Sequence, residues 1–318
     1  MINNKISIII PTFNRVWCIE NAIKSVISQN YNNWELFIID DWSTDNTNEI
    51  LKRYENDKIR YFYKNHSWKL PSVNYWIDNL ISKDSSLLFI LDSDDEFIPW
   101  ILQDVNNEFN EKSDMVSYHY KAKFPKHINR KSELISKWKN FIIADYEKLI
   151  RGETHVWEFP WFVNLKMLWD IRFEEACVNF MENIFWYRIA RNWNAKFINK
   201  EFIFVDSSRK DFGEEDNLTS YSHIFERAKL MIDWFDILIN ENFLDALNSS
   251  KNILSKWYLK QFQWCIIDRQ LKKWFNSWME SLKYWDIKMK VKVFILWILF
   301  LTPKFLLPLV LRIYYRFK

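Results

Sequence analysis

An apolar run, Leu87–Leu91, leads directly into an acidic stretch, Asp92–Glu96, in which four of the five residues are Asp or Glu. A continuous apolar run of this length is typical of a strand that is buried on both faces of a sheet. Carboxylates that follow such a strand emerge at the carboxyl edge of the sheet, where open α/β folds bind ligands. They repel one another unless a cation lies between them. In the alternative interpretation the acids mark the N-terminus of a following helix, a position that acidic residues favour.

The same succession of an apolar run, a polar turn and a helical stretch recurs through the first 120 residues. In the stretch 19–29, for example, Ile19, Ile23 and Val26 have the spacing of one helix face. This repetition predicts an α/β fold with a doubly wound, mostly parallel sheet flanked by helices. A dinucleotide-binding Rossmann domain is disfavoured because the sequence contains no GxGxxG motif. The predicted strands are 5–10, 35–39, 59–63, 87–91 and 115–120, and the predicted helices are 19–29, 45–54, 71–81 and 98–109.

The chain contains two glycines, Gly152 and Gly213, but 19 tryptophans. At the ordinary usage of about 7%, a chain of this length has roughly 22 glycines. An α/β domain needs residues with positive φ at turns and helix ends, where glycine is favoured. We therefore formulate the hypothesis that UGA codons for glycine were translated as tryptophan; the alternative is an unusual but genuine composition. The tryptophans in polar turns include Trp42, Trp68, Trp169 and Trp193, whereas Trp34, Trp161 and Trp186 lie in apolar contexts.

Three linked motifs carry a family resemblance. They are Ser7–Arg15, Phe37–Asp45 and Leu91–Asp95, and in order and spacing they resemble the family 2 glycosyltransferases of the GT-A fold. The resemblance covers about the first 100 residues and continues more weakly to about residue 205. Trp42 and Trp76 depart from the family pattern, because glycine is usual at both positions. Both departures agree with the hypothesis of miscoded glycines.

The resemblance implies a nucleotide-sugar donor, expected to be a UDP-sugar, above the carboxyl ends of the strands. In the family, residues of these motifs line the nucleotide pocket, contact the base and reach the ribose. The matching positions are Pro11, Thr12, Asn14 and Asn74 in the nucleotide-sugar pocket, Asp41 at the base and Asp92 toward the ribose. For Asp41 and its neighbours Asp40 and Asp45, turn and capping roles are the alternative, which is preferred for Asp45.

The element Asp92-Ser93-Asp94 resembles the DxD motif of the family, which implies a divalent metal ion. Asp94 is the expected ligand, and Asp95 is an alternative ligand. Hard carboxylate oxygens suit Mg²⁺ or Mn²⁺, ions that also hold substrate phosphates. Cleavage of the sugar–phosphate bond builds negative charge on the departing diphosphate, and a divalent ion stabilises that charge.

Inverting transfer also needs a general base that takes the proton of the acceptor hydroxyl. The stretch Asn179–Arg188 resembles the helix start at which the family places a Glu-Asp pair, so Glu182 is the expected base. The second acid of the pair is replaced by Asn183, which cannot act as a base. Glu174 and Glu175 are alternatives to Glu182, and a capping role at the helix start is a further alternative.

The β-α alternation ends near residue 206, and a basic, apolar tail closes the chain. This tail carries seven Lys or Arg and one Asp around two apolar runs that are too short to cross a bilayer easily. It is therefore expected to lie on an anionic membrane surface; the alternatives are a single span that buries Lys304, or a helix packed on the protein. The expected parts are a GT-A catalytic domain over 1–206 (nucleotide-sugar half about 1–120, acceptor half about 121–206), a C-terminal helical extension over 207–285 and the tail over 286–318.

The expected function is that of an inverting glycosyltransferase in cell-surface polysaccharide synthesis, which passes a sugar to a glycan or lipid-linked acceptor. Three cysteines that lie far apart, without a pairing pattern, indicate a reducing compartment, and no signal peptide is visible. We therefore expect a cytoplasmic protein that is peripheral on the inner face of the cell membrane. No nucleic acid is expected as a partner. A non-catalytic nucleotide-sugar-binding or scaffold protein is the alternative, which Trp42 and Asn183 favour. A nucleotidyltransferase is disfavoured, since Pro11–Arg15 is not a Gly/Lys/Arg-rich phosphate loop.

Overall fold

The structure is a computed structural model that describes most of residues 3–205 and little of the chain beyond them. The chain divides into two compact units, Met1–Ser208 and Arg209–Lys318. The predicted helical extension and tail lie outside the described residues, apart from four positions. Within the described part of the chain, no helix is long and apolar enough to span a membrane. The described residues are 3–64, 69–79, 81–109, 115–123, 140–145, 161–168, 171–174, 183–191, 193–205, 232–233 and 236–237.

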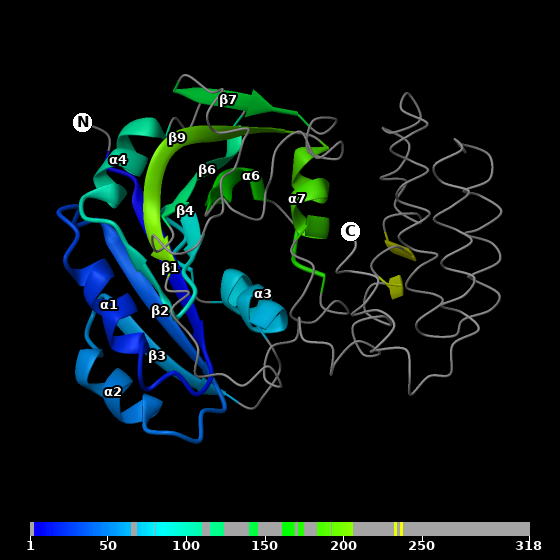
Figure 1. The fold of residues 1–318 in the computed structure, drawn as a ribbon. Coiled ribbons are helices and arrows are strands. Elements are labelled where there is room, and N and C mark those ends of the chain that lie inside the picture. The colour runs from blue at the N-terminus through cyan, green and yellow to red at the C-terminus, as the bar shows by residue number, and fades with distance from the viewer. Residues whose placement is uncertain are drawn as a thin grey trace, which may run out of the picture. The chain divides into compact units, whose positions relative to one another are not determined.

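The first unit combines one sheet with helices on both of its faces (Figure 1). The described strands are β1 (Lys5–Thr12), β2 (Trp34–Asp41), β3 (Ile59–Lys64), β4 (Ser85–Ile90), β5 (Asp95–Phe97), β6 (Met115–Lys123), β7 (Phe141–Ala144), β8 (Trp161–Asn164) and β9 (Asn194–Val205). The described helices are α1 (Ile19–Ile27), α2 (Thr47–Tyr54), α3 (Lys69–Asn79), α4 (Ile101–Glu108), α6 (Leu165–Leu168) and α7 (Asn183–Ala190).

The sheet has nine described strands in the order β3-β2-β1-β4-β8-β6-β9-β5, with β7 paired to β9. The strands β3, β2, β1 and β4 are parallel, as the repetition of strand and helix predicts. The other half is mixed: β8 is antiparallel to β4 and β6, while β9 is parallel to β6 and antiparallel to β5 and β7. The prediction of an α/β sheet flanked by helices is therefore confirmed for the described residues.

The acidic stretch does not start a helix. Asp95–Phe97 forms the short strand β5, in which Asp95 pairs with Val205 of β9. The helix α4 begins only at Ile101, three residues later than predicted. The alternative interpretation of the acids as a helix N-terminus is therefore wrong, because pairing with a distant strand extends the backbone at Asp95.

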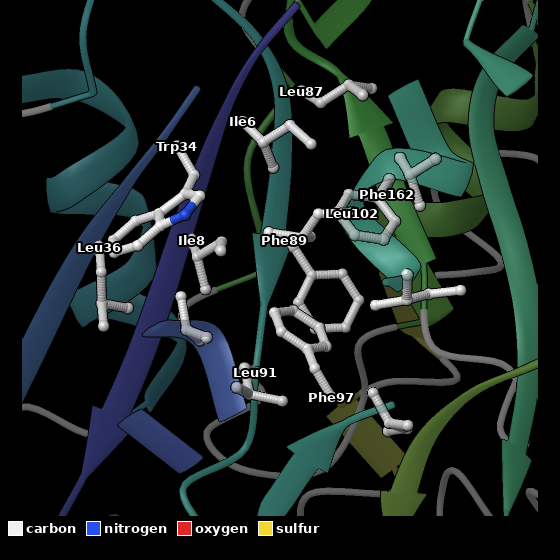
Figure 2. Close-up of a cluster of buried hydrophobic side chains, with 14 of the residues drawn as sticks. Ile6, Ile8, Trp34, Leu36, Leu87, Phe89, Leu91, Phe97, Leu102 and Phe162 are labelled. Atoms are coloured by element: carbon white, nitrogen blue, oxygen red, sulfur yellow. The ribbon is translucent and has the colours of Figure 1, made fainter. Parts of the chain in front are cut away.

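Alternate residues of the parallel strands face two hydrophobic clusters. Ile6, Ile8 and Ile10 of β1 belong to the first cluster, which also contains residues of α1, α2 and α4 and is shown in part in Figure 2. Ile9 belongs to the second cluster, together with residues of α3, α6 and α7. Because helices cover both faces, both sides of each strand are apolar, which explains the continuous apolar runs in the sequence.

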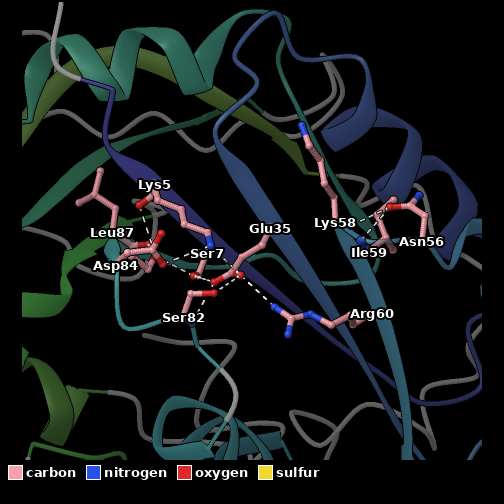
Figure 3. A network of polar contacts seen from close by, with 11 residues as sticks. Lys5, Ser7, Glu35, Asn56, Lys58, Ile59, Arg60, Ser82, Asp84 and Leu87 are labelled. Atoms are coloured by element: carbon pink, nitrogen blue, oxygen red, sulfur yellow. Dashed lines mark hydrogen bonds and ion pairs between the residues drawn. The ribbon is translucent and has the colours of Figure 1, made fainter.

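A polar network lies near the amino ends of the parallel strands (Figure 3). Glu35 of β2 is buried, and its carboxylate accepts hydrogen bonds from the hydroxyl groups of Ser7 at 2.6 Å and Ser82 at 2.5 Å. Arg60 of β3 and Lys5 of β1 form ion pairs with the same carboxylate at 2.9 and 3.4 Å. The network joins β1, β2, β3 and the segment before β4 at the edge of the sheet opposite the acidic stretch.

Candidate functional site

The carboxyl ends of β1, β2 and β4 meet at one edge of the sheet. Thr12, the last residue of β1, is in register with Asp40 of β2, and β4 lies on the other side of β1. This arrangement brings most of the predicted donor-site residues of the N-terminal half to one edge. They are Pro11 and Thr12 at the end of β1, Asn14 in the loop after it, Asp41 at the end of β2, and Asp92, Asp94 and Asp95 after β4.

Thr12 places an unused hydroxyl group at this edge. Its side chain is buried, and among the described residues its Oγ1 has no hydrogen-bond partner. A buried hydroxyl without a partner is unfavourable. The hydroxyl thus has no partner of its own within the described part of the chain, and the role of Thr12 in the pocket stays a prediction.

Asn14 joins the loop after β1 to the turn after β2. Its φ of 51° lies in the left-handed region, which asparagine tolerates. Its Oδ1 accepts the backbone N–H of Thr44 at 2.8 Å, and its own backbone N–H donates to the Ser43 hydroxyl at 2.8 Å. The carboxamide oxygen of Asn14 thus holds the shape of the predicted pocket wall.

Asp45 also binds backbone groups of these two loops. Its Oδ1 accepts the N–H of Thr47 at 3.0 Å, and its Oδ2 accepts the N–H of Val16 at 3.2 Å. The N-cap residue of α2 is Asn46, one position later than predicted. Asp45 still satisfies the first N–H of the helix, which agrees with the preferred interpretation of Asp45 as a turn residue.

The two acids at the end of β2 have different contacts. Asp40 is fully buried, and its carboxylate accepts the N–H of Ser43 at 2.8 Å and the hydroxyl of Tyr61 at 3.1 Å. Burial, reinforced by the charge of Asp40, raises the pKa of Tyr61, so this phenol stays protonated and donates. Asp41 instead forms an ion pair with Lys64 at 3.0 Å. Asp40 is therefore a structural residue of the turn, whereas Asp41, at the predicted base-contact position, is paired with a cation of β3.

A cavity of about 690 Å³ adjoins this edge, between the end of β3 and α3. Tyr63 and Lys64 line it from β3, and the Lys64–Asp41 ion pair connects it to the end of β2. Trp42 stacks on Tyr63 with ring centroids 6.2 Å apart. The sequence prediction missed Tyr63 and Lys64, although Tyr63 ends the predicted strand 59–63 and Lys64 follows it, which was the available signal. The cavity is also lined by Phe62, Pro71, Ser72, Asn74, Tyr75, Trp76, Asp78 and Asn79.

The acidic residues after β4 surround a turn that is closed by a hydrogen bond from the Asp95 N–H to the Asp92 carbonyl, at 3.0 Å. Asp92 is exposed, Asp94 is half-buried and Asp95 is buried at the start of β5. No group of three or more His, Cys, Asp or Glu side chains that could hold a metal ion occurs among the described residues. Mg²⁺ is usually bound by one or two carboxylates together with substrate phosphates and water. A site of this shared kind needs no more than Asp94 with Asp95 as the alternative ligand, and this assignment stays a prediction.

The predicted general base, Glu182, lies outside the described residues, as does its alternative Glu175. Asn183 is the first residue of α7. The other alternative base, Glu174, forms an ion pair with Arg188 of α7 at 2.7 Å. The carboxylate of Glu174 is thus engaged in holding the segment 171–174 against α7.

Asn74 of α3 binds a distant part of the backbone. Its Oδ1 accepts the N–H of Phe173, and its Nδ2 donates to the carbonyl of the same residue, each at 2.9 Å. Four residues further along α3, Asp78 accepts a hydrogen bond from Nε of Arg172 at 2.9 Å. The side chain that was predicted to contact the donor therefore ties α3 to the segment 171–174. Sequence reasoning missed this contact because the partner lies 99 residues away.

The sequence was compared with protein families and with known proteins. The sequence model of Glycosyl transferase family 2 matches residues 7–171. An uncharacterized glycosyltransferase of Rickettsia conorii is 40% identical over 119 residues, which cover 37% of this chain and 19% of that protein. The GalNAc(5)-diNAcBac-PP-undecaprenol beta-1,3-glucosyltransferase of Campylobacter jejuni is 32% identical over 109 residues, which cover 34% of this chain and 35% of that protein. The chain thus spans at most about a third of the length of these two curated relatives.

Solved structures share the fold. TarS 1–349 of S. aureus, in complex with UDP-GlcNAc, superposes with a TM-score of 0.60 at 16% identity, over 88% of this chain and 81% of that one. The family model covers about half of the chain and includes all three motifs at the carboxyl edge of the sheet. The chain therefore belongs to glycosyltransferase family 2 and has the GT-A fold.

Proposed function

We propose that this family 2 glycosyltransferase transfers a sugar, with inversion, from a nucleotide diphosphate sugar to a glycan or lipid-linked acceptor of cell-surface polysaccharide synthesis. A UDP-sugar is the first candidate donor. The observation that carries the proposal is the convergence of Thr12, Asp41 and Asp94 on one edge of the sheet, beside a cavity of about 690 Å³. Ligands of open α/β sheets bind outside the carboxyl ends of the strands.

The named relatives support these substrate classes. TarS of S. aureus has been solved in complex with UDP-GlcNAc, so a protein of this fold accommodates a UDP-sugar. The name of the Campylobacter relative specifies glucosyl transfer to an undecaprenol-linked glycan. The shared motifs at the donor edge favour a nucleotide-sugar donor for this chain, and an acceptor of the lipid-linked class is consistent with the basic, apolar tail.

In this proposal, different residues bind different parts of the donor. The loops after β1 and β2, held together by Asn14, form the nucleotide side, with Asp41 directed to the base and the Thr12 hydroxyl available to the donor. Asp94, with Asp92 or Asp95, would hold Mg²⁺ or Mn²⁺ against the diphosphate. When bound, such an ion neutralises charge on the departing diphosphate. Glu182, next to the start of α7, is the proposed base for the acceptor hydroxyl.

Donor binding provides the first test. Isothermal titration of the purified full chain with UDP-GlcNAc and UDP-glucose, with and without Mn²⁺, should show binding that depends on the metal. Asp94→Ala should remove the metal dependence, whereas Asp84→Ala, at an exposed position near the amino end of β4, should leave it unchanged. Metal-dependent binding that survives in Asp94→Ala would show that the metal assignment is wrong.

A non-catalytic nucleotide-sugar-binding protein remains the second candidate, because Asn183 replaces the second acid of the family's helix start. The substitution Glu182→Gln separates the two functions. If the chain is a transferase that uses this base, the Glu182→Gln variant no longer releases UDP when donor and acceptor are both supplied. Its affinity for the donor stays the same. A binding protein shows no turnover before or after the substitution, and its donor affinity does not change.

A further inference from the structure

Three residues with positive φ, none of them glycine, occur in the described part of the chain. They are Asn14 at 51°, Trp42 at 77° and Trp100 at 66°. The left-handed region is unfavourable for residues with a β-carbon, because that atom approaches the following carbonyl oxygen. Asparagine visits this region readily, whereas for a bulky residue it is a genuine outlier. Trp42 and Trp100 thus occupy backbone conformations that favour glycine.

Neither indole ring compensates for this backbone conformation by burial. The side chain of Trp42 is 43% exposed and that of Trp100 is 65% exposed. Trp34, by contrast, lies in β2 and is 8% exposed in the first hydrophobic cluster. An exposed aromatic ring contributes little of the stabilisation that a buried one provides. The tryptophan side chains therefore do not explain the conformations at residues 42 and 100.

Neighbouring residues impose the conformation at residue 42. The turn after β2 is held on one side by the Ser43 N–H, which donates to Asp40, and on the other by Asn14, which binds both Ser43 and Thr44. These hydrogen bonds require the chain to reverse direction immediately after Asp41. The reversal, rather than the indole, sets the positive φ at this position.

Residue 100 occupies the N-cap position of α4. Its side chain forms no capping hydrogen bond, and N-cap positions favour Ser, Thr, Asp, Asn and Gly. Among these five residue types, only glycine both adopts the left-handed backbone without a steric cost and needs no side-chain contact. The local geometry at both positions therefore indicates the same residue type.

We infer that residues 42 and 100 are glycine in the natural protein. The cause would be a UGA codon that specifies glycine and that was read as tryptophan in the conceptual translation of the gene. The composition supports this cause, since no glycine precedes Gly152 in a chain with 19 tryptophans. Trp34, which is buried in a strand, remains a genuine tryptophan.

Glycine at residue 42 changes the donor edge. It removes the ring that stacks on Tyr63, and so frees one face of a tyrosine that lines the cavity next to the Asp41–Lys64 ion pair. We expect a nucleotide to bind more tightly to Trp42→Gly than to the chain with tryptophan. This consequence rests on the proposed function, whereas the identity of residue 42 does not.

Peptide mass spectrometry of the protein isolated from its source cells tests the inference directly. Cleavage after Lys24 and Lys52 yields one peptide, 25–52, that contains both Trp34 and Trp42. The expected fragment ions place tryptophan at 34 and glycine at 42, so the peptide contains its own control. The peptide 84–112 reports on residue 100. Tryptophan at 42 and 100 in the isolated protein would overturn the inference.

Recombinant variants test the physical argument independently of the gene. Trp42→Gly and Trp100→Gly should raise the midpoint of thermal unfolding, whereas Trp34→Gly should lower it. Trp42→Ala removes the same indole but keeps a β-carbon, so it should melt below Trp42→Gly. If Trp42→Gly and Trp100→Gly lower the midpoint as Trp34→Gly does, tryptophan is the native residue at both positions. UDP titration of Trp42→Gly then tests the donor-site consequence: unchanged affinity with raised stability would contradict that consequence alone.

Discussion

Replacing Glu35 by alanine should destabilise the N-terminal unit by about 3 kcal/mol. The carboxylate accepts three hydrogen bonds from Ser7 and Ser82 (Figure 3), and at about 1 kcal/mol for each lost bond their sum gives this value. The ion pairs with Arg60 and Lys5 add little, because Arg60 is 38% exposed and both cations can turn to water.

Urea unfolding followed by circular dichroism measures this loss. Glu35→Gln keeps the shape of the side chain and one acceptor oxygen, so it should be less destabilising than Glu35→Ala. Glu20→Ala is the matched control, since Glu20 lies on the exposed face of α1, in an ion pair with Lys24, and its removal should change stability little. If Glu35→Ala unfolds at the same urea concentration as the unsubstituted chain, the network does not stabilise the sheet.

The remaining predictions concern pH, α3 and the acidic turn. Burial raises the pKa of Glu35, but hydrogen bonds from Ser7 and Ser82 outweigh it and leave the pKa below the ordinary value of 4.5. The stabilisation by this carboxylate is thus complete above about pH 4.5 and is lost as the pH falls through the lowered pKa; acid titration of Glu35→Gln should lack this component. Asn74→Ala should lower stability by about 2 kcal/mol, because two buried hydrogen bonds to Phe173 disappear; an unchanged melting midpoint would refute this. Asp94→Asn should weaken donor binding in Mn²⁺ but not in EDTA, and equal losses in both would contradict a metal role.

The sequence was sufficient to predict the first four strands and the edge at which they present polar residues. Runs such as Leu87–Leu91 are apolar at every position because both faces of a parallel sheet are covered by helices. The motifs that end β1, β2 and β4 lie in the loops that the order of elements brings together. Thr12, Asp41 and Asp94 could therefore be assigned to one edge before any contact was known.

Other parts of the site depended on partners that lie far away along the chain. Asp95 is in a strand because it pairs with Val205, although the acids around it also suit a helix start. The carboxamide of Asn74 is engaged by the backbone of Phe173, 99 residues away, which no local pattern indicates. Apolar periodicity records only which side chains are buried.

The left-handed conformation at residue 42 has the same kind of origin. It follows from hydrogen bonds between two loops that are separated by α1. The sequence motif indicated glycine at residue 42, but only the structure showed the left-handed backbone there and at residue 100. Local sequence determined the elements and their order, because burial and helix or strand geometry act over a few residues. The tertiary structure decided which distant group pairs with each buried hydrogen-bonding group. Every such group needs a partner, and the fold can supply that partner from any part of the chain.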